Sequence, residues 1–168
     1  MNWINYRAQA TSLQARVQKH VLLSLLSMSR DAAPNETGGI LIGRYSQDLR
    51  TVTLTKALEP PSDSVAGPIT FQRGVNGLQE ILAETWIRDG HYYVGEWHSH
   101  PHANASPSPT DDKQMQRIAK STNYQCPEPV LVILGNSMKD ISDCRIYLYR
   151  SRCRSLELQQ TLFEERPE

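Results

Sequence analysis

Apolar residues between positions 8 and 30 recur at nearly regular intervals of four. This stripe is typical of an amphipathic helix that packs one face on a core. The pattern therefore predicts one long N-terminal helix from Ala8 to Arg30, which ends at the polar segment 31–35. The members of the stripe are Leu13, Val17, Val21, Leu22, Leu25, Leu26 and Met28.

Shorter apolar runs predict the strands of a mixed sheet. Residues 39–45 and 51–58 are separated by a short polar turn, which predicts a hairpin, and residues 92–98 predict a third strand. The continuous apolar run at 130–134 is typical of a strand that is buried on both faces, whereas 145–150 alternates and indicates a half-buried strand.

Helices and loops separate these strands. Helical patterns cover 78–86, closed by Asp89 and Gly90, then about 110–122 and 156–165, while 59–68 and 101–109 are proline- and serine-rich loops. The chain has 168 residues, the length of one ordinary domain. We expect a single α/β (α+β) domain over 1–168, with a mixed β-sheet flanked by the long N-terminal helix and the helix at 110–122.

Composition excludes several kinds of partner. Lys plus Arg and Asp plus Glu each number 18, so the net charge is zero and no excess of positive charge favours nucleic acid or an anionic membrane. No apolar run approaches the ~20 residues of a membrane-spanning helix. We therefore expect neither nucleic acid nor a membrane as a partner.

The cysteines and the N-terminal residues indicate the compartment. The chain has 3 cysteines and no C-x-x-C pair, which argues against a cysteine-based zinc site and is typical of reduced thiols. The first residues lack the basic and apolar regions of a secretory signal. Both features predict a cytoplasmic protein.

Histidines are concentrated in one short segment. Of the 5 histidines, four fall between residues 91 and 102, and His98 and His100 are separated by one residue. Side chains two apart on a strand point to the same face, so both imidazoles can reach one ion. Asp111 could add a carboxylate oxygen. Two histidines and one aspartate leave a tetrahedral zinc with an open position for water, as in catalytic zinc sites.

Each of these features also has a structural explanation. Ser108 followed by Pro109 and Asp111 is a good helix start, because serine is a favoured N-cap and an acidic residue suits the first turn. Paired strand histidines can be partly buried polar groups. The combined pattern H-x-H-x7-S-x-x-D, however, is expected by chance only roughly 0.0006 times in a chain of this composition. The combination therefore favours a functional site.

Together with Glu36-Thr37-Gly38-Gly39 and His98-Ser99-His100-Pro101, the Ser108-x-x-Asp111 segment resembles the JAMM motif of the MPN-domain metalloproteases. These are zinc isopeptidases that remove ubiquitin and its relatives, and the resemblance spans residues about 10–150. It implies an MPN-like mixed sheet, with a layout similar to that of cytidine deaminases. It also implies that Zn²⁺ is held by His98, His100 and Asp111, that Glu36 is the general base, and that Ser108 hydrogen-bonds the oxyanion.

The segment Gly95-Glu96-Trp97-His98 resembles the compact bacterial members of the family, among them the deconjugating isopeptidases of antiphage CBASS operons. This resemblance implies that the substrate is a ubiquitin-like modifier or a conjugated protein tail. It further implies two partners, a cGAS-like nucleotidyltransferase and its ubiquitin-ligase-like conjugating enzyme. Glu96 shares a strand face with the histidines, but this position is not catalytic in the family. The resemblance also implies that residues 59–68 correspond to the segment that helps to clamp the modifier; the alternative is that they form only a surface connection.

Two other functions stay open from the sequence. One is a metal-free MPN scaffold that binds partners without catalysis. The other is a different small zinc hydrolase, such as a nucleobase deaminase, although those enzymes use H-x-E with P-C-x-x-C and this chain has no C-x-x-C.

Overall fold

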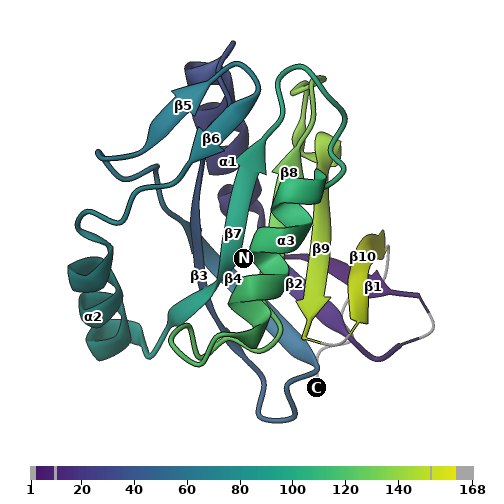
Figure 1. The fold of residues 1–168 in the computed structure, drawn as a ribbon. Coiled ribbons are helices and arrows are strands. Elements are labelled where there is room, and N and C mark those ends of the chain that lie inside the picture. Colours follow the sequence, from purple (N-terminus) through teal and green to yellow (C-terminus); the bar gives the residue numbers. More distant parts are fainter. Residues whose placement is uncertain (1–2, 10, 152, 162–168) are drawn as a thin grey trace.

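The computed structural model describes residues 3–9, 11–151 and 153–161. Eight strands close into a barrel in the order β1-β10-β9-β8-β7-β3-β4-β2, and β5 and β6 form a separate two-stranded sheet (Figure 1). The barrel strands are β1 (Trp3–Ala8), β2 (Gln14–Gln18), β3 (Gly38–Tyr45), β4 (Thr51–Ala57), β7 (Tyr92–Ser99), β8 (Val130–Leu134), β9 (Cys144–Arg150) and β10 (Cys153–Thr161). The other elements are α1 (Lys19–Ala32), β5 (Val65–Gly67), β6 (Thr70–Gln72), α2 (Leu78–Asp89), α3 (Pro109–Lys120) and the 3-10 turn η1 (Ile141–Asp143).

The closed barrel corrects the predicted open sheet with a long N-terminal helix. Strand β1 pairs antiparallel with both β2 and β10, and β2 pairs parallel with β4. These pairings join the two sides that an open sheet would leave as edges. The sheet is mixed, as expected, because β7 and β8 are also parallel while β3 is antiparallel to its neighbours. The class is still α+β.

The predicted helix from Ala8 to Arg30 is wrong in its first half. The helix begins at Lys19, and the preceding segment contains a turn and β2; residue 10 lies outside the described residues. Leu13, Ala15 and Val17 are buried while the residues between them are only partly buried, which is the pattern of a strand. A spacing of four residues equals two strand repeats as well as about one helical turn, so it fits both structures.

The predicted helix at 156–165 is also wrong over its described part, which belongs to β10, and residues 162–165 lie outside the described residues. Leu156 and Leu158 pair with residues of β9, and β1 pairs along the other side of the strand. Pairing on both sides outweighs the helical preference of leucine, glutamate and glutamine. The predicted loop at 59–68 likewise contains a strand, β5.

The remaining predicted elements are confirmed, and they form the support of the site. Helices α1 and α3 lie on opposite faces of the sheet formed by β3, β7, β8 and β9 (Figure 1). Val132 belongs to the core that includes α1, and its neighbours Leu131 and Ile133 belong to the core that includes α3. Strand β8 is therefore buried at every residue, as its apolar run predicts. Among the described residues, no helix has the length and apolarity needed to cross a bilayer.

Candidate metal centre

His98 and His100 lie at the end of β7, which runs between β3 and β8, and Asp111 approaches them from the first turn of α3. The Nδ1 atom of His98 lies 3.0 Å from Oδ1 of Asp111, and Nε2 of His100 lies 3.4 Å from Oδ2. Ligand atoms of the three residues lie within 4.8 Å of one another, and each residue is 7% exposed. The structure thus brings together the three residues predicted as metal ligands.

This set of side chains fits a divalent metal ion. Two imidazole nitrogens and one carboxylate oxygen are the donors of a catalytic zinc site that keeps one position open. The Nδ1 atom of His100 lies 3.4 Å from the carbonyl oxygen of Asn104. In the neutral imidazole whose Nδ1–H donates to this oxygen, Nε2 carries the lone pair that a metal ion would accept, and this is the usual way that a metal-binding histidine is oriented.

The start of α3 aims Asp111 at the histidines. Ser108 is the N-cap: its Oγ accepts a hydrogen bond from the backbone N–H of Asp111 at 3.2 Å, and its own N–H donates to Oδ2 of Asp111 at 2.7 Å. The hydroxyl of Tyr149 donates to Asp112 at 2.6 Å and holds this turn against β9. The helix start predicted as an alternative explanation is present, in the form of a capping box, and it also positions the carboxylate.

The charges of the cluster support one another. Burial alone would raise the pKa of the Asp111 carboxyl, but hydrogen bonds with His100 and His98 outweigh it and hold that pKa far below its usual value. The hydrogen bond with Asp111 in turn raises the pKa of His100, against the effect of burial. Asp111 is therefore ionised at neutral pH, as a metal-binding carboxylate must be.

The register between β3 and β7 carries the Glu36 segment to the metal centre. Gly38 pairs with His98. The N–H of Thr37 donates to Oγ of Ser99 at 3.1 Å, and the N–H of Ser99 donates to the carbonyl oxygen of Thr37 at 2.8 Å. The Ser99 side chain lies on the opposite face of β7 from the two histidines, and its hydrogen bond with Thr37 holds the Glu36 segment against β7. Because these hydrogen bonds fix the backbone of Thr37, they also fix where the preceding residue, Glu36, lies.

Glu36 interacts electrostatically with the cluster. Partial burial raises the pKa of its carboxyl; His100 opposes that rise and Asp111 adds to it. A glutamate whose pKa is raised is better suited to transfer protons near neutral pH than a fully solvated one. The residue that the sequence connects to the site only by resemblance therefore lies within electrostatic reach of it.

The β5–β6 hairpin lies beside the same centre. The ring of Phe71 packs edge-on against the His98 ring, with centroids 5.9 Å apart. The carbonyl oxygen of Gly67 accepts a hydrogen bond from the N–H of Glu36 at 2.8 Å. A Cβ atom on Gly38 would lie 2.7 Å from the His98 ring and 2.8 Å from Phe71, so only glycine fits between them. Sequence reasoning missed Phe71, because one aromatic residue in a polar segment has no periodic pattern around it.

Glu96 does not belong to the cluster. It is fully buried and makes two charge-assisted hydrogen bonds with Arg73, at 2.8 Å and 3.1 Å. The hydroxyl of Tyr93 donates to the same carboxylate at 3.0 Å. Both oxygens are therefore occupied by partners within the protein, which agrees with a non-catalytic position.

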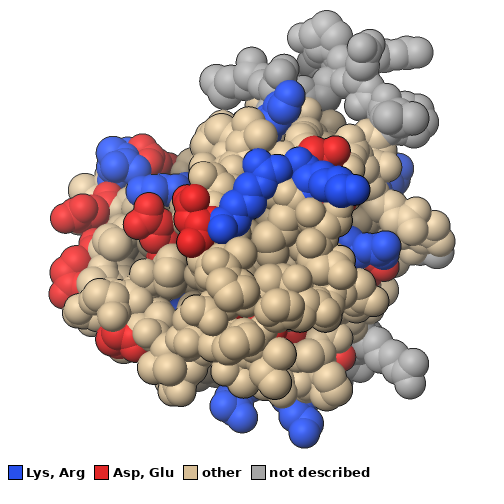
Figure 2. Space-filling model, turned by 90° about the horizontal axis from the view of Figure 1, so that it is seen from above, with Lys and Arg blue, Asp and Glu red and all other residues tan. Residues whose placement is uncertain are grey.

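The surface around the centre has mixed charge. Figure 2 views the molecule from the end of the barrel at which β7 and β8 terminate. Acidic and basic side chains lie next to one another over part of this face, and a broad area of it is uncharged. No single sign of charge dominates this face, so its electrostatics do not favour a polyanion.

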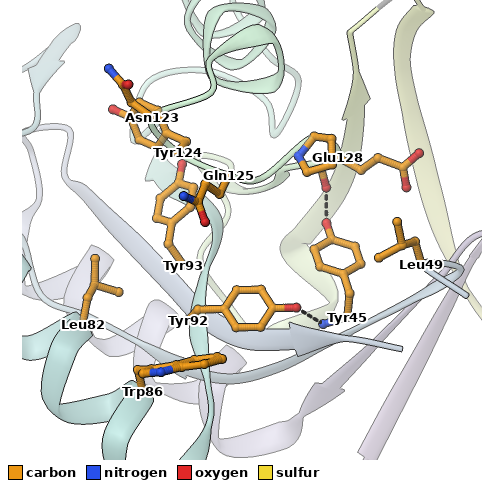
Figure 3. A pocket seen from close by; sticks show the side chains of 11 residues that line it. Tyr45, Leu49, Leu82, Trp86, Tyr92, Tyr93, Asn123, Tyr124, Gln125 and Glu128 are labelled. Carbon is orange, nitrogen blue, oxygen red and sulfur yellow. Dashed lines mark hydrogen bonds between the residues drawn. The ribbon is translucent and has the colours of Figure 1, made fainter. Parts of the chain in front are cut away.

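A separate cavity lies at the other end of β7. It has a volume of about 490 Å³, and Figure 3 shows Tyr92 and Tyr93 at the start of β7 facing it together with Trp86 of α2. The rise of a strand, about 3.3 Å per residue, places these tyrosines roughly 17–20 Å from His98. The cavity is therefore distinct from the metal centre. Its lining residues are Tyr45, Leu49, Leu82, Trp86, Tyr92, Tyr93, Asn123, Tyr124, Gln125, Pro127 and Glu128.

The chain is similar to several known proteins. Residues 18–147 match the model of a family described as prokaryotic homologs of the JAB domain. A CD-NTase/cGAS isopeptidase of Enterobacter hormaechei subsp. hoffmannii is 47% identical over 119 residues, which cover 71% of this chain and 66% of that protein. The probable metalloprotease y4qB of Sinorhizobium fredii is 29% identical over 102 residues, which cover 59% of this chain and 62% of that protein.

The solution structure of protein DSY2949 from Desulfitobacterium hafniense is similar, with a TM-score of 0.56 and 25% identity; the match covers 84% of this chain and 87% of that one. The chain spans just under two thirds of the length of the two curated relatives. The family match extends from the end of β2 into β9 and includes all five predicted site residues.

Proposed function

Because the chain belongs to the family of prokaryotic JAB-domain homologs, as its resemblance to the JAMM motif predicts, we propose that it is a zinc-dependent isopeptidase. The observation that carries this proposal is the convergence of His98, His100 and Asp111, whose ligand atoms lie within 4.8 Å of one another. These residues would hold the metal ion. The similarity to a probable metalloprotease supports the same activity.

Each further site residue has a defined task in peptide hydrolysis. Zinc, when bound, lowers the pKa of a coordinated water to about 7. Glu36 would take a proton from the water and pass it to the leaving amine. The Ser108 hydroxyl accepts the N–H of Asp111, so its own hydrogen is free to donate to the carbonyl oxygen on which negative charge develops.

The substrate tail would bind in an extended conformation along the β5–β6 hairpin. An extended segment can pair its backbone with an exposed strand edge, and this hairpin forms a separate sheet of its own. Val65 and Ile69 are 66% and 77% exposed and offer apolar contacts. Phe71 packs against His98 and narrows the space beside it, so the residue before the cut bond would have to be small.

The name of the relative that is 47% identical supports a specific substrate class. We include in the proposal that the conjugated protein is a cGAS-like nucleotidyltransferase of a CBASS operon, joined to its targets by a ubiquitin-ligase-like enzyme. The isopeptidase would reverse this linkage. A cytoplasmic location and a single catalytic domain over residues 1–168 are parts of the same proposal.

The test uses a nucleotidyltransferase of this class, from the same genome, whose C-terminal carboxyl is joined by an amide bond to a lysine side chain of a second protein. The zinc-loaded enzyme is expected to release the nucleotidyltransferase with its C-terminus intact, as measured by mass spectrometry. The Glu36→Gln variant and the chelated protein are the controls. Binding of the conjugate without cleavage by zinc-loaded protein would contradict the proposal and indicate a scaffold.

A further inference from the structure

The β5–β6 hairpin is a separate two-stranded sheet whose base is held by hydrogen bonds between residues 63–64 and 74–76. At its base, the Asp63 carboxylate accepts hydrogen bonds from the N–H groups of Val75 and Asn76, both at 3.0 Å. Ser64 accepts a hydrogen bond from the N–H of Gly74 at 2.9 Å. A two-stranded sheet by itself is marginally stable, so the contacts with the barrel determine where this unit lies.

One of these contacts is the ion pair between Arg73 and Glu96. The Arg73 side chain is 9% exposed and that of Glu96 is 0% exposed. The two hydrogen bonds run from Nε and Nη2 of Arg73 to the two carboxylate oxygens, and the Tyr93 hydroxyl holds the carboxylate from another direction. Tyr93 lies at the start of β7 and also faces the cavity of about 490 Å³ described above (Figure 3).

A bidentate pair of this kind fixes direction as well as distance. Planar guanidinium and carboxylate groups with two parallel hydrogen bonds allow little sliding or rotation, whereas an apolar contact allows both. A buried ion pair adds little net stability compared with apolar side chains of similar size. Its main effect here is therefore to specify the position of the hairpin.

The ion pair lies next to the contact between the hairpin and the metal centre. Arg73 lies two residues after Phe71, one residue past the end of β6, and His98 lies two residues after Glu96 in β7. The Arg73–Glu96 pair and the Phe71–His98 contact thus join residues 71–73 to β7 at two neighbouring places. Together with the hydrogen bond from the Glu36 N–H to the carbonyl oxygen of Gly67, they hold the hairpin at three places, and of these three only the Arg73–Glu96 pair is charged and bidentate.

We propose that Arg73 is a positioning residue: through its buried ion pair with Glu96 it fixes the β5–β6 hairpin over the metal centre and thereby sets the affinity for the substrate tail. The kinetic consequence rests on the isopeptidase function proposed above. The positional consequence does not, because it concerns the hairpin alone.

The first test compares Arg73→Met with Arg145→Met, which removes an exposed ion pair with Glu157 on the barrel wall. Hydrogen–deuterium exchange over residues 63–76, zinc content, kcat and KM are measured, with the nucleotidyltransferase–lysine conjugate as substrate. In Arg73→Met we expect at least about tenfold faster exchange in the hairpin and an at least about tenfold higher KM, with kcat and zinc near wild type. Arg145→Met is expected to match wild type in all four.

A second variant covers the case in which the single variant does not fold, because Glu96 would be left buried without its cation. The double variant Arg73→Met/Glu96→Leu removes both charges and keeps apolar side chains in the same space. We expect a folded, zinc-binding protein whose hairpin still exchanges faster and whose KM is still raised. Wild-type exchange and KM in a folded variant of either kind would overturn the proposal, as would a loss of kcat with unchanged KM.

Failure of the proposed function gives a different result. If wild-type protein cleaves no conjugate, the isopeptidase function fails, and exchange over residues 63–76 still decides whether Arg73 holds the hairpin. If wild type cleaves and the hairpin of the folded variants exchanges at the wild-type rate, only the positioning role fails.

Discussion

Replacing Ser108 with alanine removes one hydroxyl to which we assign two tasks. The hydrogen bond from the Asp111 N–H to Oγ, 3.2 Å long, is lost, while the 2.7 Å bond from the Ser108 N–H to Asp111 uses the backbone and survives. Loss of a serine N-cap costs about 1 kcal/mol. In a domain of this size, that corresponds to a decrease of about 2–4 °C in Tm.

The expected effect on catalysis is much larger. Removing one hydrogen-bond donor to an oxyanion lowers kcat by roughly 10–1,000-fold. A domain with about 5–15 kcal/mol of unfolding free energy is still more than about 99% folded after losing about 1 kcal/mol. Lower stability therefore cannot produce the decrease in kcat, and the two tasks of Ser108 can be measured separately.

The assay combines kcat, zinc content and thermal unfolding for wild type, Ser108→Ala and Ser108→Thr. Threonine keeps a hydroxyl that can cap the helix and donate to substrate, so Ser108→Thr is expected to retain most of the activity. A Ser108→Ala variant that turns over at the wild-type rate would refute the oxyanion role and leave Ser108 as a helix cap. Loss of zinc from this variant would show that Ser108 acts by positioning Asp111.

Other changes test the remaining site residues. His98→Ala is expected to lower the zinc content from about one ion per chain to near zero by elemental analysis, and retained zinc would contradict its role as a ligand. Glu36→Gln is expected to keep the zinc and lower kcat at least about 100-fold; near-normal turnover would show that Glu36 is not the base. Gly38→Ala places a Cβ 2.5 Å from the backbone oxygen of Trp97, so zinc affinity and Tm should both fall, and wild-type values would mean that β3 shifts freely. A tryptophan immediately before the cut bond is expected to block cleavage, and rapid cleavage of such a substrate would show that the hairpin does not narrow the site.

The hydrophobic pattern within one segment predicts correctly those elements whose structure depends mainly on that segment. The run at 130–134 predicts a doubly covered strand because both of its faces meet a core, and the structure has that strand as β8. The pattern fails between Leu13 and Val17, where a spacing of four fits a strand and a helix equally well. Ala15 is the informative position, because its burial indicates a period of two.

Barrel closure and the placement of Glu36 depend on contacts between distant segments. The side chains of His98, His100 and Asp111 converge because a strand, a short loop and a capped helix follow one another directly, so the sequence is sufficient to suggest them. Glu36 reaches the centre through the pairing of β3 with β7, which no periodicity specifies. Its role comes from resemblance alone. Arg73 gives no sequence signal, because its importance lies in a partner 23 residues away.

Barrel closure has a consequence for synthesis of the chain. Asn5 pairs with Thr161, so β1 can complete its pairing only after a strand 156 residues later in the chain has been synthesised. Until β10 has been synthesised, β1 and β9 each lack the neighbour that covers one of their sides. Unpaired strand sides recruit other polypeptides, and nascent chains are exposed to this risk for as long as translation continues. The chain is therefore vulnerable to aggregation while β10 is still missing, when the metal-binding segment is already complete and the barrel is still open.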